Sequence, residues 1–402
     1  MILRLHIGIM LSLLSLFSAT PQQTLESRRR AFPEWGKEMT LQVYLDRDSA
    51  TERSTAGANG RFATWSAREN DRVLAPRDNP TTLNFPCSCE TFRREVIIVQ
   101  PKSSKIERGV GYGIASVYTQ PENRGKGHAK HMMRLLHWVL AKAESLPLDF
   151  PQEWGLPPAR PEAFSDSSVS VLYSDIGEHF YSSCGFLPGS DHQDGWSVAR
   201  KCSTIFLVTQ LAETANLLEE RWEWLEGKEL KTLWDMDSEI IEKEMEAKVQ
   251  VQAEAMQPAF TFLPREGLAE FQTLRAGYFA QRLALEPVHY GIRLRDEVPG
   301  TGLDGLVYAS WTLDLQASTT KKLVVTRLRV PPSLFGELVS VLGRFCKRYG
   351  IDRVEFWNLT ESLVTASDGM GGTTADMKDH LPSMKWYGAE RSRDVEWVNN
   401  EK

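Results

Sequence analysis

The pattern of apolar and polar positions divides the first half of the chain into strand-like and helix-like segments. Residues 88–99 alternate polar and apolar side chains and then become continuously apolar, which is typical of a strand that is first half-buried and then fully buried. Two further β-prone runs end at Thr119 and Asp175. Between them, apolar side chains recur at three- and four-residue intervals from Met132 to Leu140, which predicts one amphipathic helix.

Shorter patterns complete this half of the chain. The spacing and the breaker residues predict a short strand at 62–65, a proline-rich surface loop at 146–161, a short helix at 178–184 that ends at Gly185, and one or two strands within 196–207. Strands and helices in this mixture indicate an α/β (α+β) fold in which a mixed sheet is flanked by helices.

The second half begins differently. Residues 211–254 are almost wholly helical in character and heavily charged, and 239–254 has the composition of a solvated linking helix. A strand at 323–330, a helix at 332–349 and a strand at 353–358 then predict a sheet with a crossover helix. Because 402 residues are many for one core, we expect a domain at 11–207, a charged helical linker at 208–258 and a C-terminal α/β domain at 259–402.

Composition excludes several classes of function. The 47 basic and 53 acidic residues leave a net charge of −6 without a large basic block, which argues against nucleic acid as a partner. No internal apolar run reaches the length of a membrane span. The five cysteines are odd in number and contain no Cys-x-x-Cys pair, so we expect reduced thiols rather than disulfides or a zinc ribbon. His128 and His131 lack an accompanying carboxylate motif, and we expect no metal.

The residues most suggestive of chemistry lie between the strand that ends at Thr119 and the helix that follows. Residues 124–129 read Arg-Gly-Lys-Gly-His-Ala, and a glycine-bearing turn at a helix N-terminus directs unpaired N–H groups toward one point, where a pyrophosphate is stabilised. A Walker loop is excluded because Gly127 follows Lys126 where Ser or Thr is required. The glycines at 109, 111 and 113 lack the third glycine of a dinucleotide fingerprint.

The remaining pattern, Arg-x-x-Gly-x-Ala, resembles the acyl-CoA signature of the GCN5-related N-acetyltransferase (GNAT) superfamily. A second match follows one helix and one strand later, where Tyr181, Gly185 and Phe186 fit the pattern Tyr-x-x-x-Gly-Phe. The resemblance implies a GNAT-like mixed sheet and a catalytic role for Tyr181 in protonating the departing CoA thiolate. A phenol suits this role because its pKa of about 10 keeps it protonated at neutral pH.

Segments in both halves, including Ser88–Arg93, Ile114–Tyr118 and Leu172–Gly177, are similar to the fungal lysine N6-acetyltransferases of lysine catabolism. This resemblance implies that acetyl-CoA is the co-substrate and that a small-molecule amine, free L-lysine, is acetylated on its side chain. The implied acetyl-CoA contacts are the strand end and the turn: Val117, Tyr118, Thr119, Arg124, Gly125, Lys126, Gly127, His128 and Ala129. The N–H near Val117 would stabilise the developing oxyanion.

The amine must lose a proton, because a lysine side chain has a pKa of about 10.4. Glu90 and Asp175 are the candidate bases, the first on the neighbouring strand and the second at a strand end. Either carboxylate equally fits a substrate-binding role toward the ammonium group, or a helix cap. The residues leave these alternatives open.

The N-terminus allows two interpretations. Arg4 and the apolar run from Ile7 have the shape of a secretory leader, but a cut after Ala19 places Phe17 where a small residue is required. The alternative is a first strand at 11–19 followed by a helix from Thr20 or Pro21. We favour the strand and a cytoplasmic protein, because acyl-CoA chemistry belongs inside the cell. Rival functions are acetylation of a protein lysine, a polyamine or another amine, and acyl-CoA binding without catalysis.

Overall fold

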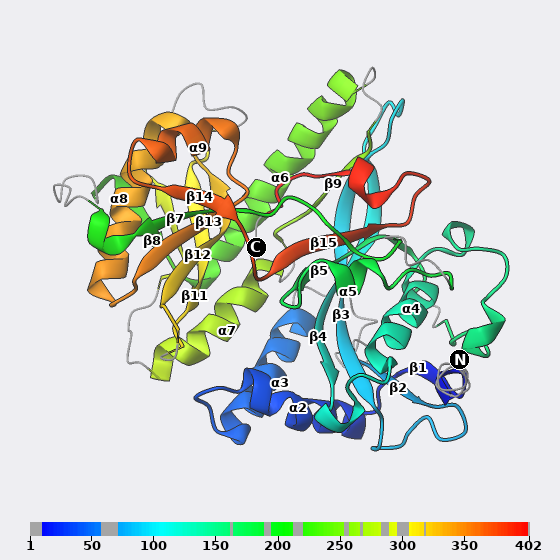
Figure 1. Ribbon diagram of the computed structural model, residues 1–402. Coiled ribbons are helices and arrows are strands. Elements are labelled where there is room, and N and C mark those ends of the chain that lie inside the picture. The colour runs from blue at the N-terminus through cyan, green and yellow to red at the C-terminus, as the bar shows by residue number, and fades with distance from the viewer. Residues whose placement is uncertain are drawn as a thin grey trace.

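Two mixed β-sheets organise the molecule (Figure 1). The computed structural model describes residues 10–57, 71–160, 164–188, 194–211, 220–252, 257–265, 268–282, 289–295, 305–316 and 319–400. The expected strand at 62–65 lies outside these residues. The expected fold class, mixed sheets flanked by helices, is confirmed.

The first sheet contains nine strands, and the long β3 is at its centre. Its main path is β1 (Leu14–Ser18), β2 (Asp71–Pro76), β3 (Cys87–Val99), β4 (Glu107–Thr119), β5 (Ser167–Ser174), β15 (Leu381–Trp386) and β6 (Ser197–Val198). Outside this path, β9 (Ala259–Phe262) pairs with β3, and β16 (Glu396–Trp397) pairs with β9. One edge of β3 pairs first with β2 and then with β9, whereas β4 pairs along the other edge. The last apolar part of β3 is buried on both faces, as its sequence predicts.

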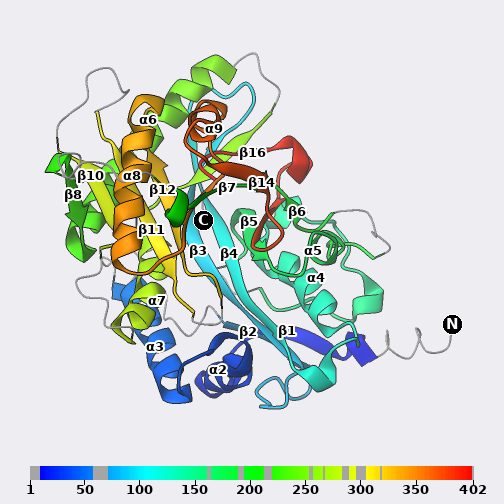
Figure 2. The same ribbon diagram turned by 60° about the vertical axis from the view of Figure 1, so that its left-hand side comes forward.

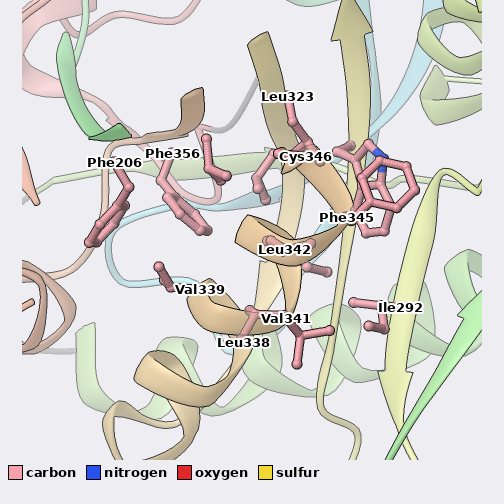
Figure 3. Packing of buried hydrophobic residues seen from close by; sticks show 14 of the residues in the cluster. Phe206, Ile292, Leu323, Leu338, Val339, Val341, Leu342, Phe345, Cys346 and Phe356 are labelled. Carbon is pink, nitrogen blue, oxygen red and sulfur yellow. The ribbon is translucent and has the colours of Figure 1, made fainter. Parts of the chain in front are cut away.

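The second sheet contains seven strands, in the order β14 (Thr373–Asp376), β7 (Cys202–Leu207), β13 (Arg353–Trp357), β12 (Lys322–Arg329), β11 (Tyr308–Asp314), β10 (Gly291–Leu294) and β8 (Trp222–Leu225). The expected crossover is confirmed, because β12 and β13 are parallel and α8 (Pro332–Arg348) connects them. The apolar face of α8 packs against this sheet, with Leu342 and Phe345 among the side chains of Ile292, Leu323 and Phe356 (Figure 3).

Helices cover both sheets (Figures 1 and 2). They are α2 (Pro21–Trp35), α3 (Leu41–Gly57), α4 (His128–Leu140), α5 (His179–Ser182), α6 (Gly227–Gln252), α7 (Leu268–Arg282) and α9 (Glu361–Asp368), in addition to α8. The first strand is confirmed at the N-terminus, where Leu16 of β1 is buried. Thr20 then starts α2 with a capping box, since Thr20 Oγ1 accepts from Gln23 N and Gln23 Oε1 accepts from Thr20 N.

The sheets do not follow the expected domain boundaries. Strand β7, from the expected first domain, pairs with β13 in the second sheet, whereas β9, β15 and β16, from the expected C-terminal domain, join the first. Residues 222–225 form a strand rather than a helix, because Trp222 and Trp224 alternate with Glu223, a pattern that suits pairing with β10.

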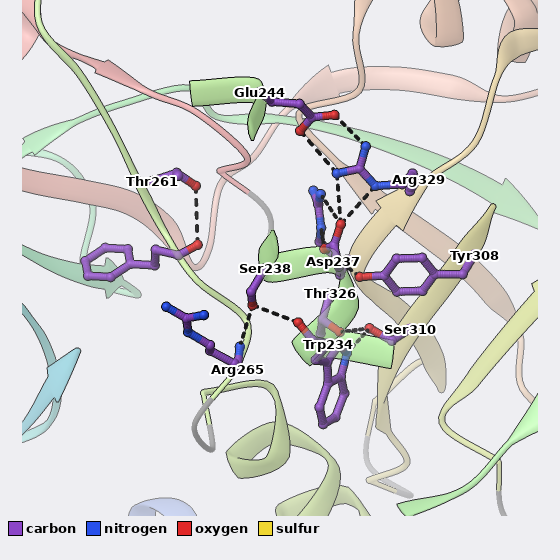
Figure 4. Close-up of polar contacts among 12 residues, drawn as sticks. Trp234, Asp237, Ser238, Glu244, Thr261, Arg265, Tyr308, Ser310, Thr326 and Arg329 are labelled. Atoms are coloured by element: carbon purple, nitrogen blue, oxygen red, sulfur yellow. Dashed lines mark hydrogen bonds and ion pairs between the residues drawn. The ribbon is translucent and has the colours of Figure 1, made fainter. Parts of the chain in front are cut away.

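The helix α6 is not a solvated linker, although its outer face is charged. Ile241, Met245 and Val249 pack against the end of β3, and Leu233 and Trp234 pack beside the second sheet. Asp237 on the same helix is completely buried, accepts from Tyr308 and forms ion pairs with Arg327 and Arg329 (Figure 4). The helix therefore connects the two sheets through apolar and ionic contacts.

Candidate active site

Strands β4 and β5 are parallel neighbours only over part of their length. Their pairing runs from Val110 opposite Ser167 to Gly113 opposite Val171. Beyond Gly113, no strand within the described residues pairs with this edge of β4, and β5 continues in pairing with β15 on its other side. The main chain of the last part of β4 is therefore accessible to a ligand between the two parting strands.

A β-bulge lies at the point where the strands part. Ser88 is opposite Tyr118, but Glu90 is opposite Ala115, so β4 has one extra residue in this interval. Ser116 adopts a φ of 52°, which is uncommon for a residue other than glycine, and its hydroxyl donates to Glu90 Oε2 at 2.7 Å. The bulge turns the main chain near Val117 away from regular pairing, as bulges beside functional sites often do.

The turn after β4 is tied back to the strand by Arg124. The Arg124 Nε donates to Thr119 O at 3.0 Å, and its Nη2 forms an ion pair with Glu34 at 2.8 Å. Gly125 and Gly127 have φ values of 73° and 83°, in the left-handed region that favours glycine. Alternating left-handed residues bring successive N–H groups to one side of the main chain.

The helix α4 starts at this turn, with Gly127 as its N-cap and His128 as its first residue. Within the described residues, no acceptor is found for the N–H groups of residues 125–129, and the N–H of His131 donates to Gly127 O. Free N–H groups and the positive end of the helix dipole together favour an anion. The turn at 124–129 is therefore suited to an anionic group such as a pyrophosphate.

Tyr181 of α5 lies on the α4 side of the first sheet. Its carbonyl accepts from the N–H groups of Cys184 and Trp196, each at 3.1 Å, which holds the residue in position. Burial raises the pKa of its phenol above the ordinary value, and Cys184 and Cys89 are near enough to add to this rise. Since Cys89 is the β3 residue opposite the bulge, Tyr181 lies on the bulged side of β4.

Glu90 faces the opposite side of the sheet, toward α2, α3 and α7. Burial raises the pKa of its carboxyl group, and the Asp48 carboxylate raises it further. The Arg28 guanidinium, the hydroxyl of Ser116 and the Arg275 guanidinium lower it. Glu90 therefore combines a pKa shifted in the direction that a general base requires with a position beside the bulge.

Asp175 follows β5 and has a different environment. Its Oδ1 forms an ion pair with His380 Nδ1 at 2.8 Å and accepts from the N–H of His380 at 3.0 Å. The side chain is more than half exposed. Its observed contacts hold the start of β15 beside the end of β5.

Sequence reasoning missed Ser116, which contributes both the bulge and the hydrogen bond to Glu90. Serine in a strand carries no signal of a positive φ, so this role depends on the paired strands. Among the described residues, no group of three or more histidine, cysteine or acidic side chains has an arrangement suited to a metal ion. No helix in the described part of the chain is both long and apolar enough to span a bilayer.

The parting parallel strands, the bulge and the glycine turn at a helix N-terminus together form an α/β arrangement that can hold an extended, anionic ligand. Residues 207–402 match the family model described as the LYC1 GNAT-like C-terminal domain. A "Lysine acetyltransferase" of Yarrowia lipolytica is 27% identical over 177 residues, which cover 43% of this chain and 40% of that protein. The matched part thus spans about two fifths of the length of this relative.

Two solved structures are also similar over 93% of this chain. A GCN5-related N-acetyltransferase from Anabaena variabilis is 12% identical, with a TM-score of 0.47 and 73% of that chain covered. Another from Kribbella flavida is 11% identical, with a TM-score of 0.42 and 72% covered. Residues 207–402 thus match a GNAT-like domain, and part of the chain is similar to a fungal lysine acetyltransferase.

Proposed function

We propose that the protein is an acetyl-CoA-dependent N-acetyltransferase that acts on a small-molecule amine. One observation carries this proposal: the bulged end of β4 has no described partner strand on its β5 side and leads directly into a turn whose N–H groups at residues 125–129 have no acceptor among the described residues. The strand end suits a thioester and its extended arm, and the turn suits the two phosphates at the other end of the same ligand. Val117, Tyr118, Thr119 and residues 124–129 are the proposed contacts.

In the proposed reaction, the amine nitrogen attacks the thioester carbonyl carbon, and the carbon–sulfur bond then breaks. The N–H near Val117 stabilises the negative charge that develops on the carbonyl oxygen. The acceptor's ammonium group loses one proton before the attack, and the nitrogen loses a second after it; Glu90 is the proposed acceptor, directly or through a water molecule, and one of the two protons passes to solvent. The leaving thiolate gains one proton, for which Tyr181 is the proposed donor, since its raised pKa keeps the phenol protonated.

Glu90 is preferred over Asp175 as the base because of their surroundings. Glu90 is hydrogen-bonded to the bulge itself, whereas the carboxylate of Asp175 is engaged by His380. We assign Asp175 the role of holding β15 in place.

Free L-lysine is the proposed acceptor, to give acetylation of its side chain. The name of the Yarrowia relative and the LYC1-type domain support this choice. The test is release of free thiol from acetyl-CoA by the purified full chain with L-lysine, 1,5-diaminopentane, a polyamine or a lysine-containing peptide, followed by mass spectrometry of the product. Thiol release that depends on lysine supports the proposal; release with another amine alone changes the acceptor, and tight CoA binding without transfer to any amine refutes the enzyme.

A further inference from the structure

The glycines at 109, 111 and 113 alternate along β4 and have no part in the proposed phosphate site. With Ala115 they lie on the sheet face opposite α4, because they pair with Val96, Arg94, Phe92 and Glu90 of β3. A Cβ on Gly111 would come within 2.6 Å of the Phe262 ring, so that position is already covered. Among the described residues, a Cβ on Gly113 would meet only the Cβ of Phe92 within 4 Å, at 3.9 Å. No other described atom therefore covers the surface directly above Gly113.

Three side chains of β3 border this open surface on the same face. Glu90 lies at the end nearest the bulge, Phe92 lies directly opposite Gly113, and Arg94 lies at the far end, opposite Gly111. The ring of Phe92 provides an apolar wall between a carboxylate and a guanidinium.

The Arg94 guanidinium has no carboxylate partner in the described part of the chain. The guanidinium carbon lies 5.7 Å from the centre of the Phe92 ring, and Nε is buried without an acceptor among the described residues. Burial lowers the pKa of Arg94 to about 10, the Tyr173 phenol acts in the opposite direction, and no described carboxylate contributes. A half-buried cation without an anion is costly, and binding a carboxylate would offset that cost.

The spacing fits an amino acid with a long side chain. Residues 90 and 94 are four positions apart on one strand, so their Cα atoms are separated by about 13 Å. An extended lysine measures roughly 7–8 Å from its side-chain nitrogen to its carboxyl carbon. A hydrogen bond of about 3 Å at each end brings the total to roughly 13–14 Å.

We propose that Arg94 is a specificity-determining residue that binds the carboxylate of the acceptor, while the acceptor chain lies over Gly113 and its amine reaches Glu90. This inference rests on the proposed function, and it names the residue that would distinguish a free amino acid from a simple amine. Arg94 contacts the acceptor at the end away from the reacting atoms, so its loss affects acceptor choice rather than acetyl-CoA binding.

The test compares L-lysine with 1,5-diaminopentane, which is lysine without its carboxylate, in the wild type and in Arg94→Gln. For the wild type we expect a higher kcat/KM with lysine. In the variant we expect kcat/KM for lysine to fall about 10- to 100-fold, mainly through a higher KM, because one charge-assisted contact is lost. The kcat/KM for 1,5-diaminopentane and the Kd of acetyl-CoA should change little. An equal loss with both amines would overturn the proposal.

The matched control is Arg93→Gln. Arg93 is the adjacent residue on β3, points to the other face and pairs with Asp166 at 2.7 Å. The Arg93→Gln variant should leave the preference for lysine over 1,5-diaminopentane unchanged. A second variant, Gly113→Val, places a branched side chain on the open surface and should raise KM for both amines while acetyl-CoA still binds. Unchanged KM values would place the acceptor elsewhere and overturn the proposal.

The proposed function and this inference can fail separately. Should the wild type acetylate no amine, calorimetric titration of lysine into the protein with CoA present still tests Arg94. Lysine binding that Arg94→Gln abolishes and Arg93→Gln retains supports the inference even then. Equal binding in both variants, or no binding to the wild type, overturns it.

Discussion

Replacing Tyr181 by Phe removes one hydroxyl group and keeps the buried ring. Within the described residues the Tyr181 hydroxyl has no hydrogen-bond partner, so its removal should change the free energy of unfolding by less than about 1 kcal/mol. A positioned acid contributes typically about 10²–10⁴ to a rate. We therefore expect kcat to fall by about this factor, or roughly 3–5 kcal/mol in activation free energy.

The assay measures kcat by thiol release, the Kd of acetyl-CoA by calorimetry and the thermal midpoint of unfolding for the same preparations. Tyr112→Phe is the matched control, because Tyr112 is also buried but its hydroxyl donates to Asp166 at 3.2 Å. The control should lose about 1 kcal/mol of stability and keep its turnover. Unchanged kcat in Tyr181→Phe, or a parallel loss of kcat and acetyl-CoA affinity, would refute the reasoning and make Tyr181 a packing residue.

Three further predictions concern the base, the turn and a buried histidine. Glu90→Gln should lower kcat at least tenfold. Wild-type activity should decline as pH falls through the raised pKa of Glu90, because a base must be deprotonated. The same pH–rate profile in the wild type and in the variant would contradict this role. Gly127→Val forces a branched residue to a φ of 83° and should raise the Kd of acetyl-CoA. The control is Gly350→Val, beyond α8, where φ is 63° and the backbone cost is a comparable roughly 1–2 kcal/mol. This control should leave the Kd of acetyl-CoA unchanged. His137 is completely buried between Tyr387 and the carbonyl of Cys184, and burial lowers its pKa to about 3. Because the unfolded state binds the proton more readily, the contribution of neutral His137 to the free energy of unfolding is complete above pH 6.5 and decreases as pH falls toward 3, by about 2 kcal/mol at pH 5. Urea unfolding of the wild type and of His137→Gln at pH 7 and pH 5 measures this decrease. An equal loss of unfolding free energy in both proteins would count against the prediction.

Local sequence patterns were sufficient to predict the structural features that depend only on residues close together in the chain. The three- and four-residue spacing of α4, the Thr20 cap of α2 and the glycines of the turn at 124–129 are all readable from the chain, because helix faces, caps and positive φ values are set within one or two turns. The apolar run of β3 was equally readable, since burial on both faces requires it.

Only the tertiary structure decided which strands lie side by side. Strand β15 follows β5 by about two hundred residues, yet the two pair, and β9 and β16 are added to the same sheet. Every residue type offers nearly the same backbone hydrogen-bonding groups, so the sequence does not indicate which distant strand a given strand pairs with. The domain boundaries expected at 207 and 259 therefore did not anticipate that strands from each side would join the other sheet. The bulge at Ser116, the ring of charges around Glu90 and the open surface beside Arg94 likewise exist only because β3 and β4 are paired in one particular register.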